Sequence, residues 1–265
     1  MNLYLKELKS SRKSLFFWSL GMVFMIVAGM SKYGSLATTG QSLNELMNTM
    51  PQSIQAIMGI GTLDLSTPIG YFGVVFSNLI LIASIHAILM GANMIAKEET
   101  DKTAEFLLTK PLSRAQILSA KLCATVTSIL LLNIITSVVS MIILSAYYSE
   151  ASSLTSLMLL MTGMFFVQLI FASLGIFIAT INKSVKKTSA IATAALLITY
   201  LLSIAINLSK PLENLQYLTP FKYFEAKTIL VDQSLDPLFL MLTLCIVVLF
   251  TSFSYGIFKN RDLQI

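Results

Sequence analysis

The sequence contains six long stretches of apolar residues that carry almost no charge. They cover about residues 14–30, 68–96, 115–147, 154–181, 189–208 and 237–258. A stretch of about 18 or more apolar residues is long enough to cross the hydrocarbon core of a bilayer as an α-helix. Strands of a membrane barrel would instead alternate in hydropathy over about ten residues, and the sequence lacks that alternation. The sequence therefore predicts an all-α integral membrane protein with six transmembrane helices.

The overall composition agrees with this class. Charged residues make up 12% and hydrophobic residues 55% of the 265 residues, whereas a soluble domain carries about 25% charged residues. The net charge of +5 does not indicate nucleic-acid binding, because an excess of Lys and Arg in cytoplasmic loops gives the same balance. Cys123 and Cys245 both lie in apolar stretches and predict neither a disulfide nor a metal site.

The positions of the basic residues predict the orientation in the membrane. The termini and the loops on their side hold 14 of the 18 Lys and Arg residues, and the opposite side holds 4. Cytoplasmic segments carry this excess in membrane proteins, so we expect both termini inside the cell (N-in/C-in). The first apolar stretch follows basic residues, as in a signal peptide, but its length and the lack of a clear cleavage site favour a retained span.

Two polar segments on the predicted outer side show local order. Within residues 42–59, apolar residues recur at helical spacing around Pro51, which predicts two short interfacial helices. The second segment, residues 218–230, begins with Thr219-Pro220, a helix-start signal. We expect both to pack as a lid on the ends of the spans, or else to form a surface for substrate release or partner docking.

The stretch between the second and third spans carries most of the functional information. Its first part is rich in helix formers, residues 106–108 form an apolar tip, and Lys110-Pro111 ends the helix. Ser113 and Gln116 match a capping box that begins the third span. This pattern predicts a short cytoplasmic helix that acts as a lever on two spans. A solvated connector at the lipid headgroups is the alternative interpretation.

This stretch resembles the coupling segment of ABC-2 type transporter permeases, in the six-span bacterial branch associated with antibiotic and peptide export. The resemblance extends over essentially the whole chain, so we expect a single permease domain over residues 1–265. Lys102 stands where the family usually has glycine. The matching residues are Ala96, Glu98, Glu99, Thr103, Glu105, Leu107, Leu108, Pro111, Leu112, Ser113, Arg114 and Lys121.

The resemblance implies a function in the bacterial cell membrane. The chain would be the permease subunit of an ATP-driven exporter and not itself an enzyme. Its substrate would be an amphipathic peptide, an antibiotic or a lipid-like molecule. Its partners would be a second permease copy or a sister permease, and a cytoplasmic ABC ATPase. The sequence has no G-x-x-x-x-G-K-[ST] loop, so we expect no cofactor on this chain, with ATP and Mg²⁺ held by the ATPase.

The same resemblance implies which residues couple the chain to the ATPase. One contact would be the short cytoplasmic helix, and the basic loop between the fourth and fifth spans would give a second, smaller contact. The residues expected to take part are Glu98, Glu99, Thr103, Glu105, Phe106, Leu107, Leu108, Lys110, Pro111 and Arg114, with Lys183 and Lys186 in the basic loop.

A few polar residues inside the spans are candidates for a substrate cavity. Asn78, His86 and Asn93 fall within an arc of roughly 80° on the second span, and Asn133 and Gln168 lie on the third and fourth spans. Hydrogen bonding between helices is the simpler interpretation of such residues, and His86 would also suit a proton relay. We expect no acidic residue, Lys or Arg within a span interior.

Small residues on two spans suggest where a second permease could pack. Small residues let helix backbones approach closely in lipid. By the family resemblance, the first and fifth spans form the dimer seam, with candidates Gly21, Gly29, Ala190 and Ala194. Packing within the chain explains these residues equally well.

Other classes of membrane protein fit the sequence less well. An ion- or proton-coupled secondary transporter usually shows internal repeats and titratable midplane residues, and only His86 is a candidate here. Glu98-Glu99 resembles the paired glutamates of an intramembrane protease, but the expected arginine and further catalytic partners are missing. A sensing or immunity subunit that signals through the ATPase without transport would use the same lever and stays open.

Overall fold

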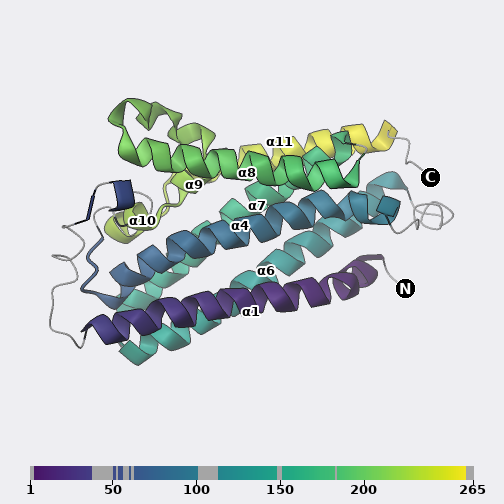
Figure 1. Cartoon of the computed structure of the whole chain (residues 1–265). Helices are drawn as coiled ribbons and strands as arrows, with labels where there is room; N and C mark the ends of the chain where they lie inside the picture. The colour runs from purple at the N-terminus through teal and green to yellow at the C-terminus, as the bar shows by residue number, and fades with distance from the viewer. Residues whose placement is uncertain are drawn as a thin grey trace.

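Six spanning helices form one elongated bundle in the computed structural model. The structure describes residues 3–37, 50–51, 53–55, 60, 63–100, 113–147, 151–182 and 184–260. Within these ranges, six helices are long and apolar enough to cross a membrane, and they lie side by side (Figure 1). They are α1 (Leu3–Ala37), α4 (Pro68–Thr100), α6 (Arg114–Tyr147), α7 (Ala151–Ile181), α8 (Val185–Leu208) and α11 (Pro237–Asn260). The prediction of an all-α fold with six spans is confirmed.

Two of the spanning helices begin at local capping signals, of which the box at Ser113 was predicted from the sequence. The hydroxyl of Thr67 accepts a hydrogen bond from the backbone N–H of Gly70 at 3.1 Å, which caps α4. At the start of α6, the backbone N–H of Ser113 donates to the side chain of Gln116 at 2.9 Å. The backbone N–H of Gln116 in turn donates to the Ser113 hydroxyl at 3.2 Å, so the predicted capping box is present.

Helices α4 and α7 form the centre of the bundle. They contain the most buried spans, with 61% and 67% of the residues in their apolar windows buried, against 11% in α11. Two glycines allow their backbones to touch. A Cβ atom on Gly91 would lie 2.3 Å from the carbonyl oxygen of Ala172, and one on Gly175 would lie 2.4 Å from that of Ile88. Small residues at the contact thus hold the central pair together.

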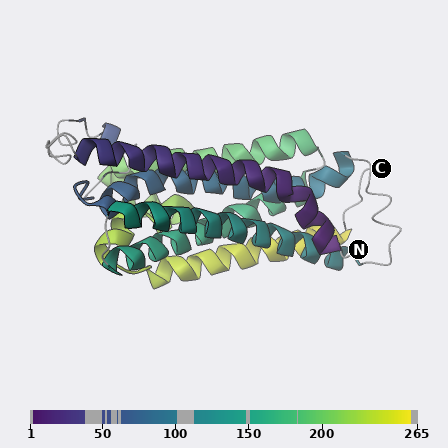
Figure 2. The ribbon, with the colours of Figure 1, turned by 90° about the horizontal axis from the view of Figure 1, so that it is seen from below.

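Helix α1 begins earlier than the sequence predicted. The apolar stretch starts near residue 14, whereas the helix starts at Leu3. Its charged first turns pack against α6, where Leu3 contacts Ile117 and the hydroxyls of Tyr4 and Thr127 lie 3.1 Å apart. In Figure 2 these turns bend away from the axis of the rest of the helix. Hydropathy alone does not predict these first turns of α1, because their residues are charged and their contacts are partly polar.

Three short helices cover one end of the bundle, opposite the described ends of the chain (Figure 1). They are η1 (Lys210–Leu218), α9 (Pro220–Tyr223) and α10 (Ala226–Asp232). Phe221, Phe224 and Ile229 are buried in the main core, so this segment packs on the span ends as the lid interpretation predicted. Of residues 42–59 the structure describes only 50–51 and 53–55, and the two predicted interfacial helices lie outside it.

Candidate functional site

A pocket of about 270 Å³ lies between α1, α4 and α6. It sits near the start of α1, the end of α4 and the start of α6, which share the end of the bundle that holds both described chain ends (Figure 1). Its wall combines charged, hydroxyl, amide and apolar groups. The residues that line it are Glu7, Ser10, Ser11, Ser14, Trp18, His86, Leu89, Met90, Asn93, Met94, Lys121, Ala124 and Thr125.

An ion pair closes one side of this pocket. The side chain of Lys121 is 1% exposed and its Nζ donates to Oε1 of Glu7 at 3.0 Å, while the Glu7 side chain is 17% exposed. The same nitrogen donates to the carbonyl oxygen of Met94 at 2.8 Å. Lys121 therefore links α6, near its start, to both α1 and α4. The carboxylate and the carbonyl offset the cost of burying the ammonium.

Two of the three polar residues predicted on one face of α4 meet at the pocket. The ring of His86 is 1% exposed and packs against Trp18, with 5.4 Å between ring centroids. Asn93 accepts a hydrogen bond from the hydroxyl of Ser189 at 2.9 Å, which links α4 to α8. Asn78 lies apart from the pocket: it is exposed, and its amide donates to the carbonyl of Val74 in its own helix.

The other two cavity candidates form a buried pair between α6 and α7. Nδ2 of Asn133 donates to Oε1 of Gln168 at 3.3 Å and to the carbonyl oxygen of Met161 at 3.1 Å. Neither residue lines the pocket between α1, α4 and α6. Their contacts match the simpler interpretation, in which polar side chains hold two helices together.

The structure describes only part of the predicted coupling region. Glu98 and Glu99 lie in the last turn of α4 and Lys186 in the first turn of α8. The side chain of Arg114 reaches across to α11, where Nη1 donates to the carbonyl oxygens of Phe258 at 3.5 Å and Lys259 at 3.4 Å. The candidates outside the described residues are Thr103, Glu105, Phe106, Leu107, Leu108, Lys110, Pro111 and Lys183.

The small residues predicted at a dimer seam divide into two groups. A Cβ atom on Gly29 would lie 2.8 Å from a methyl group of Val75, so this glycine serves the packing of α1 on α4. Gly21, Ala190 and Ala194 are exposed. Helix α4 contacts both α1 and α8, which lie on opposite sides of it in Figure 1.

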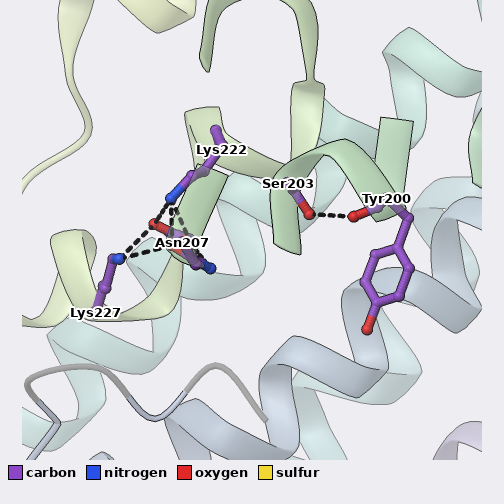
Figure 3. A network of polar contacts seen from close by, with 6 residues as sticks. Tyr200, Ser203, Asn207, Lys222 and Lys227 are labelled. Carbon is purple, nitrogen blue, oxygen red and sulfur yellow. Dashed lines mark hydrogen bonds and ion pairs between the residues drawn. The ribbon is translucent and has the colours of Figure 1, made fainter. Parts of the chain in front are cut away.

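A second polar cluster lies at the lid end of the bundle (Figure 3). Nζ of Lys222 donates to Oδ1 of Asn207 at 2.6 Å and to both carboxylate oxygens of Glu225 at 3.0 Å. Nζ of Lys227 reaches the same two partners at 3.1 Å and 3.2 Å. Burial lowers the pKa of Lys222 from 10.5, although the Glu225 carboxylate opposes this. The cluster pins α9 and α10 to the end of α8.

Sequence reasoning missed the residues that build the pocket wall on α1. In the sequence, Trp18 follows Phe16 and Phe17 at the start of an apolar stretch, as a membrane-interface anchor would, and Glu7 is one charge in a basic terminal segment. The available signal was the spacing of Glu7, Ser11, Ser14 and Trp18, which places them on one face of a helix. That signal becomes visible only once the helix is known to begin at Leu3.

Comparison with known proteins gives one match that covers nearly the whole chain. The family model described as "ABC-2 family transporter protein" matches residues 1–263. A search of curated proteins found no significant match. The six spanning helices, the pocket and the lid cluster all lie within the matched residues.

Proposed function

This chain belongs to the ABC-2 transporter family and is a multi-pass membrane subunit of a transporter. On that premise, we propose that it is the permease of an ATP-driven exporter that works with a separate cytoplasmic ATPase. The family match over residues 1–263 carries this proposal. The sequence itself has no phosphate-binding loop of the G-x-x-x-x-G-K-[ST] type, so the nucleotide would have to bind to a partner chain.

The helix ends around residues 101–112 support a coupling role for this segment. Helix α4 continues as far as Thr100, beyond its apolar part, and α6 begins at Arg114 directly after the capping box. Lys121 ties the same ends of α4 and α6 to each other and to α1. An ATPase that displaced the connecting segment would therefore move three spans together. The permease then switches between inward and outward states because the ATPase binds the two states with different affinity.

We further propose that a second permease, either a copy or a sister subunit, packs against α1 and α8. Gly21 on α1 and Ala190 and Ala194 on α8 are exposed in the single chain, as a close helix contact with a partner requires. Helix α4 lies between these two surfaces, and its exposed Asn78 would then border the space between the two permeases. An amphipathic cargo, such as a peptide, an antibiotic or a lipid-like molecule, suits such a space.

Both termini would face the cytoplasm of a bacterial cell. The excess of Lys and Arg on their side of the bundle supports this orientation. It places the pocket between α1, α4 and α6 at the cytoplasmic side, next to the coupling segment, and the lid of η1, α9 and α10 at the outer side. Export would then proceed from the pocket end to the lid end.

Co-purification from the native membrane tests the proposal. The tagged chain would be extracted in mild detergent, and its eluate analysed for proteins with a phosphate-binding loop and for ATPase activity. A double variant, Glu105→Lys with Leu108→Asp, reverses a charge and removes an apolar contact in the coupling segment. We expect the wild-type chain to carry an ATPase and the variant to lose it.

A matched control uses the same substitutions at the opposite end. Glu213→Lys with Leu218→Asp changes two exposed residues of η1, and this variant should keep the ATPase. If the wild-type chain brings down no nucleotide-binding partner in several detergents, the proposed partnership is wrong. If both double variants keep the ATPase, the partnership stands, but the ATPase does not depend on the segment assigned to coupling.

A further inference from the structure

The pocket between α1, α4 and α6 contains a buried imidazole that needs a partner. Neither ring nitrogen of His86 makes a hydrogen bond among the described residues, and the residue is 1% exposed. Burying a polar group without a hydrogen bond is unfavourable, especially at the depth of a spanning helix. Because the ring borders a pocket of about 270 Å³, something in that pocket can supply the missing partner.

The wall that α1 contributes is rich in hydrogen-bond acceptors. Five of its residues border the pocket at helical spacing, which places them on one face. This face carries a carboxylate, three hydroxyls and an indole, and the basic residues of the same segment are not among the lining residues. The lining residues are Glu7, Ser10, Ser11, Ser14 and Trp18, and the basic residues are Lys6, Lys9, Arg12 and Lys13.

A molecule entering the pocket meets the negative end of the ion pair. The side chain of Lys121 is 1% exposed and that of Glu7 is 17% exposed. Lys121 engages Oε1 of Glu7, and a carboxylate has about four acceptor sites in all. The ring of Trp18 borders the same pocket, and the face of an indole attracts cations. A neutral imidazole adds one further acceptor nitrogen.

We propose that this pocket binds the ammonium head of an amphiphile. Glu7 accepts hydrogen bonds from the ammonium, the indole face of Trp18 contacts it, and His86 accepts a hydrogen bond from the head group. The apolar part lies against lipid-facing residues of α1, where Phe17 and Leu20 are exposed. The ligand is an amphiphile because the pocket lies between spanning helices, with an apolar wall that includes Leu89 and Met90.

Two sources can supply this chemistry. One is a membrane phospholipid whose head group carries an amine, and the other is a cationic amphiphile that the transporter carries. The second source rests on the proposed function and the first does not. Binding can be measured on the chain without nucleotide or ATPase, so failure of this inference and failure of the proposed ATPase partnership give separate results.

The chain contains a built-in reporter for the test, because Trp18 is its only tryptophan. The full chain would be placed in nanodiscs of phosphatidylglycerol and titrated with dodecylammonium, whose primary ammonium head has three N–H donors, while Trp18 emission is recorded. Dodecyl maltoside, with the same alkyl chain and an uncharged head, serves as the ligand control. We expect a saturable change with the ammonium compound and none with the maltoside.

Two variants test whether the signal comes from the pocket. Glu7→Gln combined with Lys121→Met removes the carboxylate without leaving a lone buried ammonium. We expect this double variant to weaken binding at least about tenfold, because losing a hydrogen bond to a charged group lowers affinity by that factor or more. Ser14→Phe adds a large ring to the pocket wall, leaves the ion pair in place and should also abolish the saturable change. Glu213→Gln on η1 is the matched control and should bind as the wild type does.

Nanodiscs with increasing phosphatidylethanolamine separate the two sources. If the ligand is a lipid head group, this lipid will itself change Trp18 emission and will compete with dodecylammonium. If the ligand is cargo, the lipid will do neither while the ammonium compound still binds. An equal response to the maltoside, or unchanged affinity in both pocket variants, would overturn the inference and leave water as the partner of His86.

Discussion

At the scale of single residues, the pair of Glu7 and Lys121 is the most demanding feature of the bundle. Its two members are unequal, because Lys121 is 1% exposed and Glu7 is 17% exposed. An ammonium buried among spanning helices requires a counter-charge or carbonyl partners. Glu7 can instead be hydrated at the pocket mouth if its partner is removed. The two single substitutions should therefore have unequal effects on stability.

We expect Glu7→Gln to lower the free energy of unfolding by about 1–3 kcal/mol, less than for a fully dry pair because Glu7 is partly exposed. Lys121→Met should be milder, since the remaining carboxylate can reach water. The double variant should recover part of the loss. Thermal unfolding of the four proteins in one detergent measures these differences. Equal losses in both single variants would contradict the assigned asymmetry.

The buried amide pair between α6 and α7 should contribute less. Gln168→Leu removes the acceptor Oε1 but leaves Asn133 with the carbonyl of Met161. Hydrogen bonds between spanning helices are worth about 0.6 to 2 kcal/mol, so we expect a loss near the lower end. The same thermal measurement applies, and Asn78→Leu, on the exposed side of α4, is the control. A loss as large as that of Glu7→Gln would assign Gln168 a further role.

At the scale of helices, the contact of α4 with α7 depends on the absence of two side chains. Gly91 and Gly175 face backbone atoms of the opposite helix, so neither can gain a methyl group unless the helices separate. The prediction of six spans did not include this contact, since apolar periodicity does not specify which helices touch.

Gly91→Ala should therefore destabilise the bundle by about 1–3 kcal/mol, the range for overpacking. Alanine favours a helix over glycine by about 1 kcal/mol, so the clash must exceed that gain. Gly256→Ala on α11 is the matched control, because a Cβ atom there would meet nothing within 4 Å; it should be neutral or stabilising. Thermal unfolding measures the stability of both variants. An equal stability of the two would rule out the close contact of α4 with α7.

In the lid, a single carboxylate, that of Glu225, pairs with two ammonium groups. Glu225 contacts both Lys222 and Lys227, so Glu225→Gln leaves two ammonium groups close together around Asn207. We expect the amide protons of residues 220–232 to exchange roughly tenfold faster or more, since hydrogen bonds to charged groups are worth 1.5–3 kcal/mol. Hydrogen exchange with mass spectrometry measures this in nanodiscs. Glu213→Gln on η1 is the control and should leave exchange unchanged.

Local signals in the sequence predicted elements well but not the contacts between them. The capping box of Ser113 and Gln116 and the cap at Thr67 could be predicted because they join residues three apart. The pair of Glu7 and Lys121 joins residues 114 positions apart. Its prediction would require knowing which faces of α1 and α6 meet. In apolar helices those faces are weakly marked, since lipid and core select similar side chains.

At the scale of the whole molecule, the distribution of charge predicts the orientation, which can be measured directly. In a background without native cysteines (Cys123→Ser and Cys245→Ser), one variant would carry Glu213→Cys at the lid end and another Lys259→Cys near the end of α11; both positions are exposed. A membrane-impermeant maleimide on intact cells should label only the first. The second should react after permeabilisation, because the basic end lies inside. Labelling of Lys259→Cys in intact cells would show that the orientation is the opposite of the one proposed. The pocket would then lie outside, and the proposed direction of transport would be reversed.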